Sequence, residues 1–274
     1  MIPVTRTSEP DFLKQNANRW LKELQTAIIN LEQVKSNSIS KPQDIKTAKT
    51  KVKNAQNKYN PGKVNKSGIN PVKQALYDMF CGKCAFCETK VELSAGRIEH
   101  FKPKSRYIDL TFDWNNFLYS CEVCNNAEHK GDKFPLDCDG TPLLINPTDE
   151  NCDIYQYLDF YWDGNLASIY GKDGRGKIVV EIFDLNRKDL RTERSEVINN
   201  LLVLLEFAKT GDTKAIKLLI KACKYDSKYT AFALFYILPY LAHHFQILEA
   251  TDRIKEISKR SPSYAQFARV DDLF

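Results

Sequence analysis

Apolar residues near the start of the chain recur every three or four positions over residues 10–34, which is the spacing of an amphipathic helix. A polar, lysine-rich tract follows over residues 36–70. Asn70-Pro71 then places a proline at the first position of a short predicted helix. The tract is open to two interpretations, a solvated helix and loop or an arm that lies along phosphates. Its lysines are Lys41, Lys46, Lys49, Lys51, Lys53, Lys58, Lys63 and Lys66.

The second half of the chain changes from a strand pattern to a helical one. Residues 157–162 and 178–183 predict strands, with a turn at Asp163-Gly164 after the first. Helical spacing returns over residues 187–209, and Asp212 could cap the next helix. Residues 231–248 predict a buried helix that Pro239 kinks or breaks.

The composition is that of an ordinary soluble protein. The 274 residues are 43% hydrophobic and 27% charged, so the chain can bury a substantial core. A net charge of +5 is compatible with a polyanionic partner without demanding one. The first residues lack the apolar core of a signal peptide, and the apolar stretch 231–241 is too short to span a bilayer. We therefore expect a cytoplasmic protein with no membrane partner.

Two CxxC pairs, Cys84/Cys87 and Cys121/Cys124, can hold one tetrahedral Zn²⁺. Four thiolates leave no open position for water, so the predicted role of this zinc is structural. Cys81 offers an overlapping pair with Cys84 and is interpreted as an apolar neighbour instead. The remaining cysteines are predicted to be plain thiols: Cys138, Cys152 and Cys223.

The segment within and just after this frame contains residues suited to phosphodiester hydrolysis, which needs an activated water and a cation on the phosphate. Glu99 offers a hard oxygen ligand, and His100, on the opposite face of a predicted strand, can act as general base near neutral pH. Asn125 and His129 are four positions apart, so a helix would present both toward one cation. Each residue taken singly is more simply a surface or capping residue. Their combination favours a site for catalytic Mg²⁺ or Mn²⁺ beside the structural Zn²⁺.

With these residues in view, the window from residue 84 to 135 resembles an HNH nuclease, the ββα-metal fold, in its zinc-supported form. The resemblance implies that His100, following the acidic Glu99, is the base. It implies that Asn125 is the final family position, with His129 as a further ligand one turn later.

The same resemblance assigns the central asparagine of the family to Asn116, with Asn115 as the competing choice. This asparagine would brace the loop and orient His100. The implied fold class is α+β. Its parts are a helical N-terminal region at 1–70, a zinc-supported ββα-metal core at 71–140, a β-rich extension at 141–190 and a helical C-terminal region at 191–274.

Several short segments narrow the resemblance to the nuclease subunit of Septu-type antiphage systems, which also accompanies some retrons. The chain departs from that pattern where four residues separate Asn125 from Lys130. The resemblance implies an ABC- or SMC-like ATPase partner. Nothing in this chain resembles a Walker P-loop, so ATP hydrolysis is expected to take place in that partner. A retron reverse transcriptase and its msDNA are further possible partners. The matching segments are 84–88, 98–105, 116–121, 130–135, 143–147 and 185–187.

Basic residues flank the predicted site, either as a solvated rim or as phosphate contacts that position substrate without reading sequence. They are Lys102, Lys104, Arg106, Lys130 and Lys133. The predicted function is a metal-dependent HNH endonuclease, the effector of an antiphage complex, with DNA the favoured target. The alternatives are an RNA nuclease acting on tRNA in a retron-associated system, and a non-catalytic zinc-binding interaction module.

Overall fold

The computed structural model describes residues 1–60 and 68–266, so Lys63 and Lys66 of the lysine-rich tract lie outside the described residues. The chain divides into two compact units. The hairpin unit contains Arg6–Met79 and Arg97–Tyr119, and the cysteine unit contains Met1–Thr5, Phe80–Gly96 and the chain from Ser120 onward. The four-part division expected from the sequence stays a prediction.

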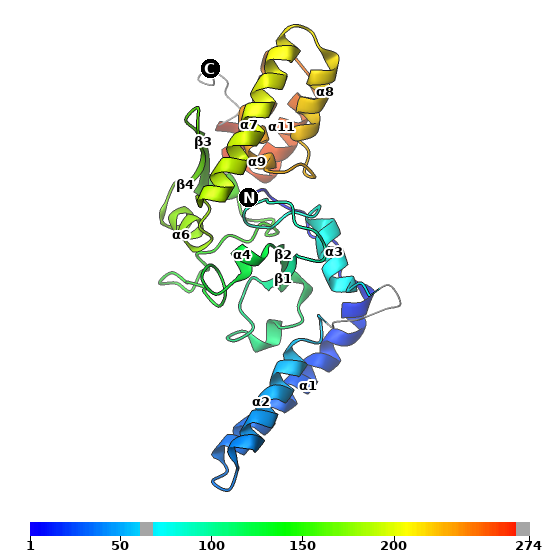
Figure 1. Ribbon diagram of the computed structural model, residues 1–274, viewed down its shortest axis with the longest axis vertical. Coiled ribbons are helices and arrows are strands. Elements are labelled where there is room, and N and C mark those ends of the chain that lie inside the picture. The colour runs from blue at the N-terminus through cyan, green and yellow to red at the C-terminus, as the bar shows by residue number, and fades with distance from the viewer. Residues whose placement is uncertain (61–67, 267–274) are drawn as a thin grey trace. The chain divides into compact units, whose positions relative to one another are not determined.

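Two long helices lie side by side in the hairpin unit, α1 (Asp11–Ser36) and α2 (Pro42–Gln56) (Figure 1). The N-terminal helix prediction is confirmed, and α1 buries a stripe formed by Leu13, Trp20 and Leu24. Helix α2 occupies residues 42–56 of the lysine-rich tract. Pro42 is its first residue, and the backbone N–H of Lys41 donates to the Asp44 carboxylate at 2.8 Å.

A short helix and a small sheet complete the hairpin unit. Helix α3 (Pro71–Met79) begins at its proline as predicted, and the Asn70 side chain accepts hydrogen bonds from the N–H groups of Val72 and Lys73. Strand β1 (Arg97–His100) pairs with β2 (Phe117–Ser120). Two short 3₁₀ turns come between these strands, η1 (Ile108–Leu110) and η2 (Trp114–Asn116).

The cysteine unit begins with α4 (Glu122–Asn125), α5 (Ile154–Tyr157) and a hairpin of β3 (Leu158–Trp162) and β4 (Ala167–Gly171). The two strands are antiparallel, with Leu158 opposite Gly171 and Trp162 opposite Ala167. The strand predicted over residues 157–162 is confirmed, and so is the turn after it, where Gly164 has a φ of +92°.

The second predicted strand, over residues 178–183, is wrong. These residues belong largely to helix α6 (Gly174–Ile182), which the Asp173 side chain caps by accepting from the Gly176 N–H at 2.7 Å. Gly176 has to be glycine, because a Cβ there would lie 2.0 Å from the Tyr157 carbonyl oxygen. The β-branched run therefore packs as a helix, with Val179 and Phe183 buried four positions apart.

Helices fill the rest of the cysteine unit: α7 (Lys188–Lys209), α8 (Thr213–Ala222), α9 (Thr230–Tyr236), α10 (Leu238–His243), α11 (Leu248–Arg260) and the 3₁₀ turn η3 (Pro262–Gln266). The helix predicted over residues 187–209 is confirmed. Asp212 caps α8 through the N–H groups of Lys214 and Ala215, as predicted. The break at Pro239 is also confirmed, because α9 and α10 are separate helices.

The predicted α+β class is confirmed, since helices accompany two small two-stranded sheets. The chain order β1, β2, α4 is that of the ββα core expected from the sequence, although α4 has only four residues. No helix among the described residues is long and apolar enough to cross a membrane.

Candidate functional site

The four predicted zinc cysteines come together in the cysteine unit. The sulfur atoms of Cys84, Cys87, Cys121 and Cys124 all lie within 4.8 Å of one another, and all four residues are buried. The Cys87 and Cys121 sulfurs are 3.8 Å apart. A tetrahedral zinc with Zn–S bonds near 2.3 Å holds its sulfurs about 3.8 Å apart, so the cluster fits this ion in both donor type and size.

A local turn of the backbone holds the two cysteines of each CxxC pair close together. The first pair lies on a tight turn in which the Glu88 N–H donates to the Cys84 carbonyl at 3.0 Å, and Glu88 has a φ of +65°. In the second pair, Cys121 is the N-cap residue of α4, and its sulfur accepts from the Cys124 N–H at 3.4 Å. Each CxxC spacing therefore fits one turn of chain.

The four clustered thiols influence one another's ionisation. Burial raises the pKa of the Cys84 thiol, whereas hydrogen bonding from Cys121 lowers that of Cys87. Burial lowers the pKa of Arg187, but the neighbouring Cys87 and Cys124 sulfurs more than offset this and leave it raised. Arg187 belongs to the matching segment 185–187, for which the sequence predicted no role. Its guanidinium lies where its positive charge can offset the negative charge of the cysteine thiolates.

The other cysteines are not members of this cluster, and no cysteine of the described residues forms a disulfide. Cys81 is partly exposed, has a φ of +51° and is not one of the four clustered cysteines. Cys138 is exposed, while Cys152 and Cys223 are buried.

The predicted base, His100, is buried at the end of β1 in the hairpin unit, with 6% of its surface exposed. Its Nε2 lies 3.0 Å from the carbonyl oxygen of Thr111. A carbonyl only accepts, so Nε2 carries the proton and the neutral ring has its lone pair on Nδ1. The ring also packs edge-on against Tyr59 and Phe117, with centroids 5.1 and 5.0 Å away.

Asn116, also in the hairpin unit, makes three side-chain hydrogen bonds to backbone. Its Oδ1 accepts from the Lys102 N–H at 2.8 Å, and its Nδ2 donates to the carbonyls of Lys102 and Leu110 at 3.0 and 3.1 Å. Leu110 precedes Thr111, whose carbonyl bonds His100, so the Asn116 amide fixes the loop after His100 and the residue before Thr111. The competing residue, Asn115, is exposed.

Glu99 is buried beside His100 on β1, with 3% of its surface exposed. Burial, with the charge of Glu99, raises the pKa of Tyr59. Tyr59 therefore lies close to Glu99 while its ring contacts His100. Sequence reasoning missed Tyr59, although an aromatic residue at the end of a lysine-rich tract was a usable signal. It missed Thr111 as well, because every residue has a backbone carbonyl and the residue type does not show which one accepts from His100.

The predicted helical pairing of Asn125 and His129 is wrong. Helix α4 ends at Asn125, and Asn126 after it is extended, with a φ of −70° and a ψ of 170°. The chain turns instead, and both the backbone N–H and the Nδ1 of His129 lie 3.0 Å from the Asn126 Oδ1. Because that oxygen accepts, Nδ1 carries the proton, and Nε2 is the ring nitrogen with a lone pair for a metal.

The basic residues that flank the predicted site differ in environment. Lys104 Nζ donates to Asn57 at 2.9 Å and to the Tyr59 hydroxyl at 3.1 Å. Lys130 is fully buried, so the solvated-rim interpretation is wrong for this residue. Arg106 and Lys133 are exposed, and Lys102 is half-buried.

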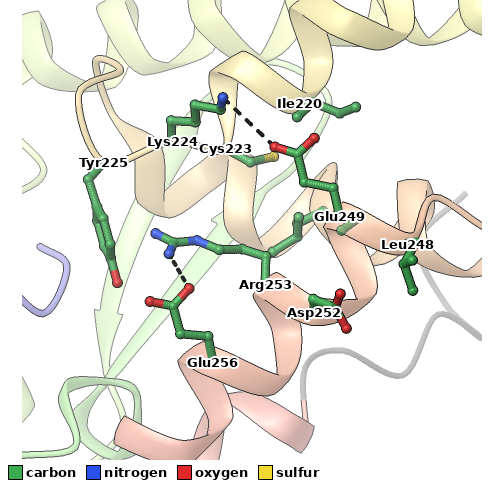
Figure 2. A pocket seen from close by; sticks show the side chains of 11 residues that line it. Ile220, Cys223, Lys224, Tyr225, Leu248, Glu249, Asp252, Arg253 and Glu256 are labelled. Atoms are coloured by element: carbon green, nitrogen blue, oxygen red, sulfur yellow. Dashed lines mark hydrogen bonds and ion pairs between the residues drawn. The ribbon is translucent and has the colours of Figure 1, made fainter.

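A cavity of about 740 Å³ lies among the C-terminal helices, outside the cysteine cluster (Figure 2). Arg253 crosses it between Tyr225 and Glu256, with its guanidinium 4.0 Å from the Tyr225 ring centroid and bonded to Glu256 at 2.6 Å. These groups already neutralise one another, and the cavity contributes none of the residues predicted for hydrolysis.

Comparisons with known proteins place this site in a family context. Residues 84–131 match the model of the HNH endonuclease family. The Septu protein PtuB of Bacillus mycoides is 30% identical over 156 residues, and the match covers 47% of this chain and 52% of that protein. The HNH endonuclease candidate of retron Vc95 from Vibrio cholerae is 27% identical over 145 residues, 50% of this chain and 68% of that protein. The Septu protein PtuA of Bacillus mycoides is 25% identical over 177 residues, 54% of this chain and 24% of that protein.

The chain spans about half the length of the PtuB proteins it matches. The predicted resemblance to HNH nucleases, and to those of Septu and retron systems, is confirmed. The matched stretch, residues 84–131, is called the HNH segment below, and it includes His100, Asn116, Asn125 and all four clustered cysteines.

Proposed function

We propose that this chain is a divalent-metal-dependent endonuclease that hydrolyses phosphodiester bonds in nucleic acid, with DNA as the favoured target. One observation carries the proposal. Within an HNH segment, His100 is bonded through Nε2 to the Thr111 carbonyl, and Asn116 braces the residue before that carbonyl. This arrangement keeps the lone pair of a buried imidazole on Nδ1, which is what a general base requires.

In the proposed reaction, His100 Nδ1 takes a proton from the water that attacks phosphorus. The new P–O bond forms as the bond to the 3′ oxygen breaks, which leaves a 5′-phosphate and a 3′-hydroxyl. Asn116 acts as a positioning residue, because its Nδ2 donates to the carbonyl of Leu110, the residue before Thr111. The burial of His100 among Tyr59 and Phe117 limits the orientations of its ring.

From the resemblance to HNH nucleases alone, we propose that Glu99, Asn125 and His129 hold the catalytic cation. Their donors are a carboxylate oxygen, an amide oxygen and the Nε2 of an imidazole, which suit Mg²⁺ or Mn²⁺. When bound, this ion would supply positive charge to the phosphate and to the departing oxygen. The hydrogen bond from His129 Nδ1 to Asn126 supports the choice of Nε2 as ligand.

The four clustered cysteines are assigned a structural Zn²⁺. Their closeness and burial support a closed tetrahedral site with no position for water. Arg187 would lie against the sulfurs and offset part of the negative charge that four thiolates bring to the ion.

The wider role follows from the relatives. We propose that the chain is the effector of an antiphage complex in which another chain, an ABC- or SMC-like ATPase, controls the nuclease. Val203 and Phe207 are exposed one turn apart on α7 and form a candidate docking surface. Phe207→Glu is expected to lose co-purification with the ATPase, and Tyr161→Glu, at an equally exposed aromatic on β3, is expected to retain it.

The nuclease assignment is tested by incubating the purified protein with DNA and RNA substrates, with and without Mg²⁺ or Mn²⁺. Metal-dependent cleavage by the wild type, lost in His100→Ala with zinc content unchanged, is the expected result. Cleavage of RNA in preference to DNA would support the retron-type alternative. Full activity in His100→Ala would overturn the assignment of the base, and cleavage of neither substrate would leave a zinc-binding interaction module.

A further inference from the structure

Helix α2 presents two flanks of different character, one beside its buried edge and one nearly opposite that edge. Ala48 and Ala55 are its buried residues. Lys46, Lys49 and Lys53 are all exposed, and at about 100° per residue they fall within about 60° of one another around the helix. One flank of α2 is therefore a straight line of lysines.

Carboxylates occupy the other flank. The Lys58 ammonium pairs with Glu23 of α1, and Glu23 lines a shallow pocket together with Lys51. Asp44 is used at the start of α2, where its carboxylate accepts from the Lys41 N–H. By helical geometry Asp44 and Lys51 lie within about 20° of each other, away from the line of lysines.

No carboxylate of the described residues forms an ion pair with Lys46, Lys49 or Lys53. Like charges three and four positions apart repel, so this line of charge costs stability when nothing binds it. A polyanion laid along the helix would relieve the repulsion and release its own counterions. An anionic ligand is therefore favoured only on the flank that carries Lys46, Lys49 and Lys53.

The line of lysines leads to the predicted base within the same unit. Asn57 follows Lys53 by four positions, and its Nδ2 donates to the Lys53 carbonyl at 2.9 Å. Its Oδ1 accepts from Lys104 Nζ at 2.9 Å, and that ammonium also lies 5.2 Å from the centroid of the Tyr59 ring. The Tyr59 ring in turn contacts the ring of His100 at 5.1 Å.

The dimensions suit a duplex. At about 1.5 Å per residue, the line from Lys46 to Lys53 is about 10 Å long, and continuing to Asn57 brings it to about 16 Å. A duplex places a phosphate about every 3.4 Å along each strand, so this length corresponds to about five base-pair steps. Lysine ammonium groups contact phosphates without reading bases.

We propose that Lys46, Lys49, Lys53 and Lys104, called the basic row, bind the phosphate backbone of a duplex nucleic acid and lead it to His100. This inference rests on the proposed nuclease function. The basic row sets position and affinity, and it contributes no sequence preference.

The test is the salt dependence of binding, measured by fluorescence anisotropy with a short DNA duplex in the His100→Ala background. The row variant carries Lys46→Gln, Lys49→Gln and Lys53→Gln. The matched control carries the same charge change at exposed lysines off the row, Lys14→Gln, Lys22→Gln and Lys51→Gln. Glutamine has nearly the helix propensity of lysine, so both proteins are expected to fold, and circular dichroism checks this.

Each lost phosphate contact lowers the slope of log K against log salt by about 0.9, so the row variant is expected to lose about 2.7 from that slope. The control variant is expected to keep the full slope. Equal slopes in the two variants would overturn the row as a binding surface. If the row variant lost more of this slope with single-stranded DNA or RNA than with the duplex, the choice of a duplex ligand would be overturned.

Failure of this inference can be told apart from failure of the proposed function. A wild type that cleaves DNA, together with a row variant of unchanged slope, overturns the basic row alone. A wild type that binds the duplex through the row but cleaves no nucleic acid with any divalent ion overturns the nuclease assignment alone.

Discussion

The Nε2 of His100 lies 3.0 Å from the carbonyl oxygen of Thr111, and this contact determines which ring nitrogen can take a proton. Asn116 holds the adjacent Leu110 carbonyl at 3.1 Å. Asn116 therefore anchors the backbone next to the hydrogen-bond partner of His100, and we propose that this helps to fix the tautomer of the ring. The contribution of Asn116 can therefore be tested separately from that of His100.

Asn116→Ala removes three hydrogen bonds to backbone, at about 1 kcal/mol each, so the free energy of unfolding should fall by about 3 kcal/mol. Urea denaturation measures this, and the metal-dependent cleavage rate should fall too. Asn115→Ala is the matched control, since its side chain is exposed and should change stability by less than about 0.5 kcal/mol. Equal losses in the two variants would contradict the assignment of Asn116.

Substitution of any clustered cysteine is expected to remove the zinc. Elemental analysis should find one zinc per chain in the wild type and none in Cys121→Ser, with a lower melting temperature, because metal binding contributes to folding free energy. Cys81→Ser and Cys138→Ser change thiols outside the cluster and are expected to retain the metal. Zinc loss in Cys81→Ser would show that this residue is a ligand.

Phe183→Ala is expected to destabilise the turn that carries Cys84 and Cys87, although Phe183 lies far from it in the sequence. The Phe183 ring stacks on Phe86, between the first two cysteines, with centroids 3.9 Å apart and both side chains buried. Loss of a buried phenylalanine costs about 3 to 5 kcal/mol, and a chelator should then remove zinc faster. Phe207→Ala, at a phenylalanine that is 55% exposed, is the control and should leave both quantities nearly unchanged.

Stability at high pH is expected to depend on Cys223. Burial raises the pKa of this thiol to about 12, whereas in the unfolded chain it ionises near its ordinary value. As pH rises from about 9 the unfolded state loses a proton that the native state keeps, so the free energy of unfolding falls by about 1.4 kcal/mol per pH unit. The stabilisation is complete below that pH and is lost as pH approaches 12.

Denaturation of Cys223→Ala at a series of alkaline pH values tests this directly, because the variant should show a shallower decline than the wild type. Cys138→Ala removes an exposed thiol and should follow the wild-type slope. Parallel curves for all three proteins would show that Cys223 ionises alike in the native and unfolded states.

Much of the fold was predictable where local chemistry decides the outcome. Pro71 and Asp212 begin helices because a proline at the first position and a capping carboxylate act within one turn. The run at residues 178–183 was not predictable, because its β-branched residues favour a strand in isolation. The close approach of Gly176 to the Tyr157 carbonyl and the stacking of Phe183 on Phe86 select a helix there instead.

Sequence alone predicted a metal chemistry for this protein: two CxxC pairs for zinc, an acidic residue beside a histidine, and an asparagine in the HNH position. These signals are local, since they depend on residue type and short spacing. Only the tertiary structure decided what surrounds the base. Thr111 contacts His100 through its carbonyl and Tyr59 through its ring, and Lys104 donates to the Tyr59 hydroxyl. No short spacing encodes such contacts between residues far apart in the chain.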